Sequence, residues 1–147
     1  MSIMYEQFRV VGLPLRTNNS EASETIPRHW EAFTQAEVAG RLGIEGDTYA
    51  VYTDHENEGK DNLGAYTFVI GHRVGADHPV PSGLIAVTVP ASYREVVVLE
   101  PGRPDLVGAA WEEVWKRNDL SLSYLADFER YGRDGAIEIS LGLLSAP

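Results

Sequence analysis

The order of apolar and polar segments in the first half of the chain predicts one strand, one helix and then two strands. Residues 5–15 are rich in Phe, Val and Leu and end in a polar run, which indicates a strand followed by a loop. A helix is expected to begin at Ser23 or Thr25 and to end near Gly40 or Gly43. β-Branched and aromatic residues then predict two further strands, at 48–54 and 65–71.

The second half contains the same order, preceded by one more strand, after a connector at 74–82 that contains two prolines. Its apolar segments predict two strands, an amphipathic helix and a closing pair of strands, at 84–89, 93–99, 105–117, 124–131 and 136–143. The four-residue loop Gly132-Arg-Asp-Gly135, with glycine at both ends, is typical of a β-hairpin.

Residues repeat between the two halves as well as elements. Gly64-Ala-Tyr-Thr-Phe-Val-Ile-Gly71 aligns with Gly135-Ala-Ile-Glu-Ile-Ser-Leu-Gly142. We therefore interpret residues 1–147 as a single domain built from a duplicated β-α-β-β unit, with halves at about 1–75 and 80–147. The predicted fold class is α+β, with an antiparallel sheet that carries two helices on one face and a ligand groove on the other.

Composition narrows the range of functions. The 147 residues include 12 Lys plus Arg against 22 Asp plus Glu, for a net charge of −10, which argues against a surface for nucleic acid. Cysteine is absent from the sequence, so disulfides and thiolate chemistry are excluded. The sequence has no apolar run of about 20 residues and no secretory signal, so a cytoplasmic protein that does not bind membranes is expected.

Seven segments in a fixed order carry a resemblance to a known family: Gly12-Leu-Pro-Leu-Arg-Thr-Asn-Asn19, Trp30-x-x-Phe33, Tyr49-Ala-Val-Tyr-Thr-Asp54, Ala65-Tyr-Thr-Phe-Val-Ile-Gly71, Trp111 to Trp115, Asp127-Phe-Glu-Arg-Tyr131 and Ile137-Glu-Ile-Ser-Leu-Gly142. In these segments, which span nearly the whole chain, it resembles the GyrI-like small-molecule-binding domain. That domain is the effector-binding domain of AraC-type and MerR-type transcription regulators.

The resemblance implies a groove that binds hydrophobic, often cationic, organic molecules around a glutamate, and it implies no cofactor. By motif position the glutamate is Glu129, with Glu138 as a second candidate. The two halves leave no residues for a helix-turn-helix, so a stand-alone member without direct DNA contact is expected. Expected partners are the small molecule and either a second copy, through an exposed edge strand, or a regulator.

The last hairpin can be analysed from spacing alone. If Tyr131 pairs with Ala136, Phe128 faces Ile139 on an apolar face and Glu129 lies directly across from Glu138. Two like charges then meet, and a cation would relieve their repulsion. The alternative is a solvated polar face, and a shift of one residue in register would separate the two carboxylates.

Aromatic residues supply candidate walls for the groove. Projecting the repeat onto the first hairpin places Tyr52 on the groove face and Tyr66 in the core. Aromatic faces beside a carboxylate suit a flat cation. The candidate ligand-binding residues are therefore Glu129, Glu138, Tyr52, Trp30, Phe33, Trp111 and Tyr131. Trp115 is assigned to core packing, which is also the alternative for Trp30 and Trp111.

Other chemistry finds little support in the sequence. The four histidines show no metal-ligand spacing, and phosphate-loop and serine-hydrolase motifs are missing. Two alternatives to a binding protein stay open. One is a hydrolase of cyclopropane-bearing or similar alkylating compounds, in which Glu129 acts with Tyr52 or Trp111. The other is an interaction module that inhibits a protein partner such as DNA gyrase through its acidic surface.

Overall fold

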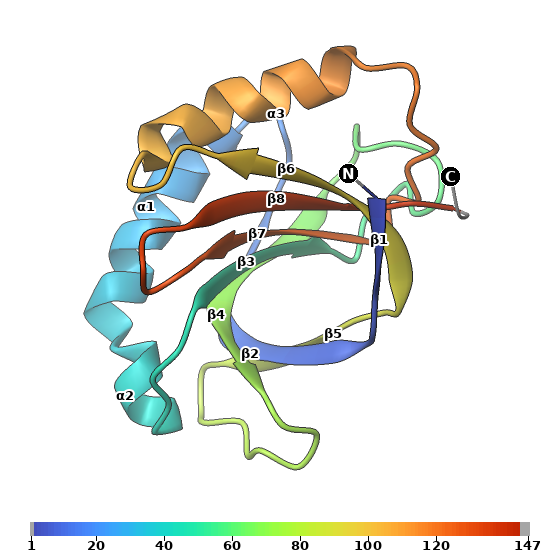
Figure 1. Ribbon diagram of the computed structural model, residues 1–147. Coiled ribbons are helices and arrows are strands. Elements are labelled where there is room, and N and C mark those ends of the chain that lie inside the picture. Colours follow the sequence, from blue (N-terminus) through green and yellow to red (C-terminus); the bar gives the residue numbers. More distant parts are fainter. Residues whose placement is uncertain (1, 145–147) are drawn as a thin grey trace.

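The computed structural model describes residues 2–144, which form one eight-stranded antiparallel sheet with helices on its outer side. The sheet curls into a half-barrel (Figure 1). Its strand order is β1-β6-β8-β7-β3-β4-β2-β5, so β1 and β5 are the two edges. The strands are β1 (Ser2–Tyr5), β2 (Phe8–Thr17), β3 (Thr48–Thr53), β4 (Tyr66–Val74), β5 (Ile85–Val89), β6 (Ser92–Leu99), β7 (Ala126–Tyr131) and β8 (Ile137–Gly142).

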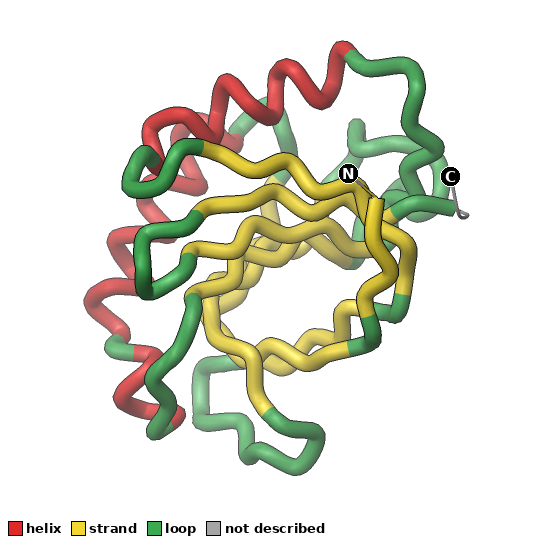
Figure 2. Tube along the Cα trace, viewed as in Figure 1, coloured by secondary structure: helices red, strands yellow, loops and turns green. Residues whose placement is uncertain are grey.

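Helices α1 (Ala22–Ala36), α2 (Val38–Leu42) and α3 (Val107–Lys116), the last preceded by a 3-10 turn at Pro104–Leu106, lie outside the curled sheet (Figure 2). The helix predicted to end near Gly40 or Gly43 is interrupted at Glu37, whose φ of 50° places it in the left-handed region. A second left-handed residue, Gly43, ends α2.

Apolar residues fill both faces of the sheet. The interior of the half-barrel is packed by alternate residues of β2, β3 and β7, among them Phe8, Val51 and Phe128. On the outer face, α3 packs through Val114 on Ile139 and Leu141, while other apolar clusters lie beneath α1 and α2. The α+β class and the antiparallel sheet with helices on one face are confirmed.

Each half contributes two strands, a helical segment and two further strands, and the sheet places β6-β8-β7 beside β3-β4-β2. The duplication itself and the 1–147 domain boundary stay predictions, and residues 1 and 145–147 lie outside the described residues. The strand predicted over 5–15 is divided into β1 and β2.

The predicted register of the last hairpin is wrong by one residue. Tyr131 pairs with Ile137, and Phe128 therefore faces Ser140 and Glu129 faces Ile139. The cause is the turn, in which the Gly132 N–H donates to the Ala136 carbonyl (2.8 Å), so that Ala136 belongs to the loop. The carboxylates of Glu129 and Glu138 consequently lie on opposite faces of the sheet.

Candidate functional site

A cavity of about 780 Å³ lies on the outer face of the sheet, where α1 and α3 flank it. This corrects the prediction of a groove on the face opposite the helices. That opposite face is the filled interior of the half-barrel, because the sheet curls around it. The lining residues are Asn19, Ala22, Ser23, Ile26, Pro27, Trp30, Thr48, Tyr52, His55, Asn62, Tyr66, Pro104, Val107, Gly108, Trp111, Glu112, Val114, Trp115, Leu122, Tyr124, Asp127, Glu129, Tyr131 and Leu141.

Glu129 places a carboxylate in this cavity while being only 2% exposed. Three side chains donate hydrogen bonds to it. The Tyr52 hydroxyl (2.5 Å) and the Trp111 indole N–H (2.7 Å) bind Oε2, and the Tyr131 hydroxyl (2.5 Å) binds Oε1. These donors come from β3, α3 and β7, so the orientation of the carboxylate is set by three separate elements.

Burial and hydrogen bonding act in opposite directions on this carboxyl group. Burial raises the pKa of Glu129, whereas hydrogen bonds from Tyr131, Tyr52 and Trp111 lower it. The neighbouring phenols respond to their own burial and to this negative charge, which raise the pKa of Tyr52 and Tyr131 and bring that of Tyr66 to about 12. The phenols therefore stay protonated and act as donors at neutral pH.

Aromatic rings surround the carboxylate. Trp111 meets Tyr52 edge to face at 5.3 Å between ring centroids, and Trp30 meets Tyr131 in the same way at 5.2 Å. Trp115, assigned to core packing from the sequence, instead lines the cavity, is 50% exposed, and lies 6.0 Å from the Trp111 ring.

Of the seven residues predicted to bind ligand, five line the cavity together: Glu129, Tyr52, Trp30, Trp111 and Tyr131. Phe33 does not line it. Its ring packs edge-on against Trp30 (6.0 Å) and beside His72 (5.8 Å), within the apolar clusters beneath the helices. Phe33 therefore packs against the cavity-lining Trp30 without lining the cavity itself.

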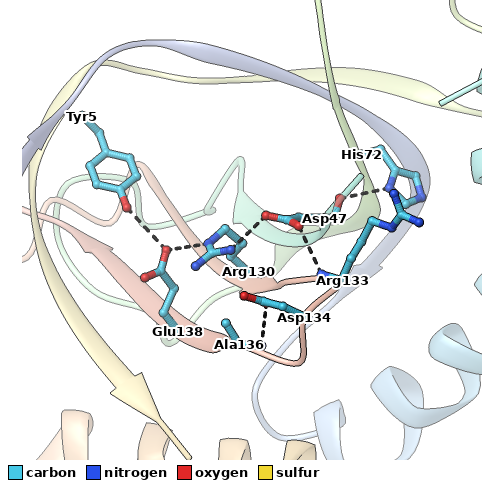
Figure 3. Close-up of polar contacts among 8 residues, drawn as sticks. All are labelled: Tyr5, Asp47, His72, Arg130, Arg133, Asp134, Ala136 and Glu138. Carbon is cyan, nitrogen blue, oxygen red and sulfur yellow. Dashed lines mark hydrogen bonds and ion pairs between the residues drawn. The ribbon is translucent and has the colours of Figure 1, made fainter. Parts of the chain in front are cut away.

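Glu138 is the second residue outside the cavity, and Figure 3 shows its surroundings. Its carboxylate accepts a hydrogen bond from Arg130 Nε (2.8 Å) and one from the Tyr5 hydroxyl (3.4 Å). Arg130 also binds Asp47 (2.9 Å). The prediction that Glu138 faces Glu129 is wrong, because the register pairs it with Arg130 on the other face of the sheet.

The sequence reasoning missed Tyr66. Tyr52 pairs with Phe68 across β3 and β4, so Tyr66, two residues before Phe68, shares the cavity face with Tyr52. The repeat alignment placed Tyr66 in the core instead. The loop between these strands is long, so the sequence does not determine their register. No other local signal in the sequence indicates which face Tyr66 occupies.

Asp127 is a second buried carboxyl group, two residues before Glu129 and 6% exposed. It accepts a hydrogen bond from the Gly142 N–H (2.8 Å) and interacts electrostatically with Arg94. Burial raises its pKa from 3.8 to about 6, against the opposing effects of Gly142 and Arg94. The folded state therefore holds this proton more tightly than the unfolded chain does.

We expect the Asp127 contribution to stability to be present below pH 4 and to be lost as the pH rises through about 6. Asp127→Asn keeps an acceptor for Gly142 and removes the titration. The free energy of unfolding of the wild type, relative to the variant, should fall by about 2–3 kcal/mol between pH 4 and pH 7 in urea titrations. Asp77→Asn, at an exposed position, is the control. Parallel pH profiles for wild type and Asp127→Asn would contradict the assignment.

Between residues 2 and 144, the side chains include no group of three or more His, Cys, Asp or Glu positioned to hold a metal ion. Among the helices of the same residues, none is long and apolar enough to cross a membrane.

Comparison with known proteins agrees with this architecture. Residues 3–141 match the Cass2 family, described as integron-associated effector binding proteins. The chain belongs to the Cass2 family. YobU of Bacillus subtilis (strain 168), named as a candidate transcriptional regulator, is 26% identical to this Cass2-family chain over 134 residues, covering 88% of the chain and 84% of YobU.

Solved structures share the Cass2-family fold. An integron cassette protein from the mobile metagenome of Vibrio cholerae superposes with a TM-score of 0.81 at 23% identity, over 97% of this chain and 94% of that one. SAV2435, solved bound to tetraphenylphosphonium, has a TM-score of 0.73 at 17% identity, over 97% and 92% of the two chains. The solved structures share the fold, and the family match with the relationship to YobU identifies the chain as an effector-binding protein related to those of transcription regulators.

Proposed function

We propose that the cavity binds a hydrophobic organic cation and that Glu129 provides its counter-charge. The observation that carries this proposal is a nearly fully buried carboxylate within an aromatic cavity. None of the described residues that line the cavity is a lysine or an arginine. The carboxylate thus lacks a cationic partner from the protein at the place where a ligand would enter.

Physical chemistry favours a cation over a neutral ligand in this position. A carboxylate removed from water loses solvation, which three neutral donors replace only in part. Aromatic faces attract cations, by about 0.5–2 kcal/mol for each ring depending on desolvation. The three hydrogen bonds also hold the carboxylate in one orientation, which favours a static counter-charge over the hydrolase alternative.

The family relationship points the same way. Cass2-family proteins are described as effector-binding, and the structurally similar SAV2435 was solved with the lipophilic cation tetraphenylphosphonium. The wider relationship to GyrI-like domains is part of this proposal. A binding protein of this kind would sequester or sense lipophilic cations.

Two ions of nearly the same shape and opposite charge test the proposal: tetraphenylphosphonium and tetraphenylborate. We expect tetraphenylphosphonium to bind with a dissociation constant in the micromolar range, about −8 kcal/mol, and to raise the unfolding temperature as its concentration rises. Tetraphenylborate should not bind the cavity, because Glu129 repels it. Isothermal titration calorimetry of both salts measures the difference, and equal binding of the two ions would overturn the proposal.

A further inference from the structure

One part of the cavity, connected to Glu129 through Tyr52, is lined by polar residues that carry no formal charge. Asn19, His55, Asn62 and Tyr66 line it, and we call these four residues the polar end. The Tyr66 hydroxyl donates to Asn19 Oδ1 (3.0 Å), and Asn19 Nδ2 donates to the Asn62 carbonyl (3.2 Å). Two loops, the one after β2 and the one between β3 and β4, are joined by these bonds.

His55 is the least satisfied residue of the polar end. It is 7% exposed, and neither ring nitrogen has a hydrogen-bond partner within the described residues. Burial and Arg16 lower its pKa, against the opposing effects of Glu58 and Asp54, so the ring is neutral at pH 7. A buried polar group without a partner costs about 1–3 kcal/mol and calls for an explanation.

Asn62 has a side chain available for a ligand. Its backbone carbonyl accepts the bond from Asn19, whereas no hydrogen bond of its side-chain amide is found in residues 2–144. The amide is half-buried at the cavity wall. It can therefore offer both a donor and an acceptor to a neutral polar group.

A row of ring contacts connects the polar end to Glu129. Trp111 lies 5.3 Å from Tyr52, Tyr52 lies 5.6 Å from Tyr66, and Tyr66 lies 5.5 Å from His55. Trp111 and Tyr52 are also the two donors to Glu129 Oε2. One elongated ligand could thus contact the carboxylate and the polar end along a single aromatic wall.

We infer that the polar end is a second subsite, which selects cations that carry a neutral hydrogen-bonding group such as an amide, a carbonyl or a hydroxyl. The inference rests on the proposed function, because the cationic part of the same ligand is held at Glu129. The hydrogen-bonding group binds the Asn62 amide, and a rotation of the buried His55 ring toward the cavity would let the same group supply the partner that His55 lacks. The polar end then distinguishes one lipophilic cation from another, whereas Glu129 distinguishes cations from other molecules.

Two probes of equal shape test the second subsite: (4-carbamoylbutyl)triphenylphosphonium and its hydrocarbon counterpart, (5-methylhexyl)triphenylphosphonium. The wild type should bind the carbamoyl probe about tenfold more tightly in calorimetric titrations, despite the cost of desolvating its amide. Asn62→Ala and His55→Phe should each reduce this ratio to about twofold or less. Leu63→Ala, on the neighbouring exposed residue that does not line the cavity, is the matched control and should keep the ratio.

The outcomes separate the two proposals. If both probes bind through Glu129 but the ratio is one, or is unchanged in Asn62→Ala and His55→Phe, the second subsite is wrong and the proposed function stands. If neither probe binds the wild type, both proposals fail. His55→Phe should also unfold at a temperature no lower than that of the wild type, because it removes unpartnered polar atoms; unfolding at a clearly lower temperature would indicate a structural role instead.

Discussion

Glu129→Gln is expected to weaken the binding of tetraphenylphosphonium by about 30- to 100-fold, or about 2–3 kcal/mol. Glutamine fills the same volume and can still accept hydrogen bonds, so the loss measures the negative charge itself. Titration calorimetry at pH 7.5 gives both constants. Lowering the pH should weaken binding to the wild type in the same direction, because burial raises the pKa of Glu129 and its protonation removes the charge.

Glu138→Gln is the matched control for this experiment. It makes the same chemical change in the same hairpin, but its carboxylate lies on the other face of the sheet, bound to Arg130. We expect Glu138→Gln to bind tetraphenylphosphonium as the wild type does. An undiminished affinity in Glu129→Gln, or an equal loss in both variants, would show that the cavity carboxylate is not the counter-charge.

Gly71→Ala is expected to lower the free energy of unfolding by about 3 kcal/mol or more. Gly71 pairs with Gly12 across β4 and β2, where the two strands approach closely. A Cβ on Gly71 would lie less than 3.0 Å from the Val11 carbonyl oxygen and the Gly12 Cα. Both contacts are with backbone, so a side-chain rotation cannot relieve them. Urea denaturation, with far-UV circular dichroism to verify the fold, measures the effect.

Gly40→Ala gives the contrasting result in the same measurement. A Cβ on Gly40, within α2, would meet no atom within 4 Å. Because alanine favours helix over glycine, the variant should be as stable as the wild type or more stable by up to about 1 kcal/mol. A Gly71→Ala protein of wild-type stability would show that the two strands can separate at this point without cost.

The sequence predicted most elements of this fold because each carries a strong local pattern. β-Branched and aromatic runs marked β3, β7 and β8 to within two residues and β4 to within three, and the apolar stripe of α3 marked that helix. Glu129, by contrast, was singled out by family resemblance. Glu129 is buried, and it accepts hydrogen bonds from three elements, because of tertiary packing. Residue spacing along one strand cannot predict either property.

The errors at Glu138 and Tyr66 share one physical origin, the exact pairing of strands across loops. Ala136 belongs to the turn, so every pairing partner of β7 differs by one residue from the predicted register. Glu138 therefore lies on the opposite face of the sheet from Glu129. The sequence does not predict the polar end for the same reason. His55 and Asn62 belong to the long loop between β3 and β4, and contacts with Asn19 and Tyr66 fix the path of that loop. The misplaced groove has a separate cause, because the curvature of the whole sheet determines which face holds the cavity.

The two strands that end the sheet, β1 and β5, contain no charged residue. Charged side chains on such strands commonly prevent one copy from adding to the sheet of another. In this chain the net charge of −10 opposes such association by long-range repulsion. Since salt at 0.1 M screens such repulsion beyond about 10 Å, we expect the tendency of copies to associate through these edges to rise with ionic strength.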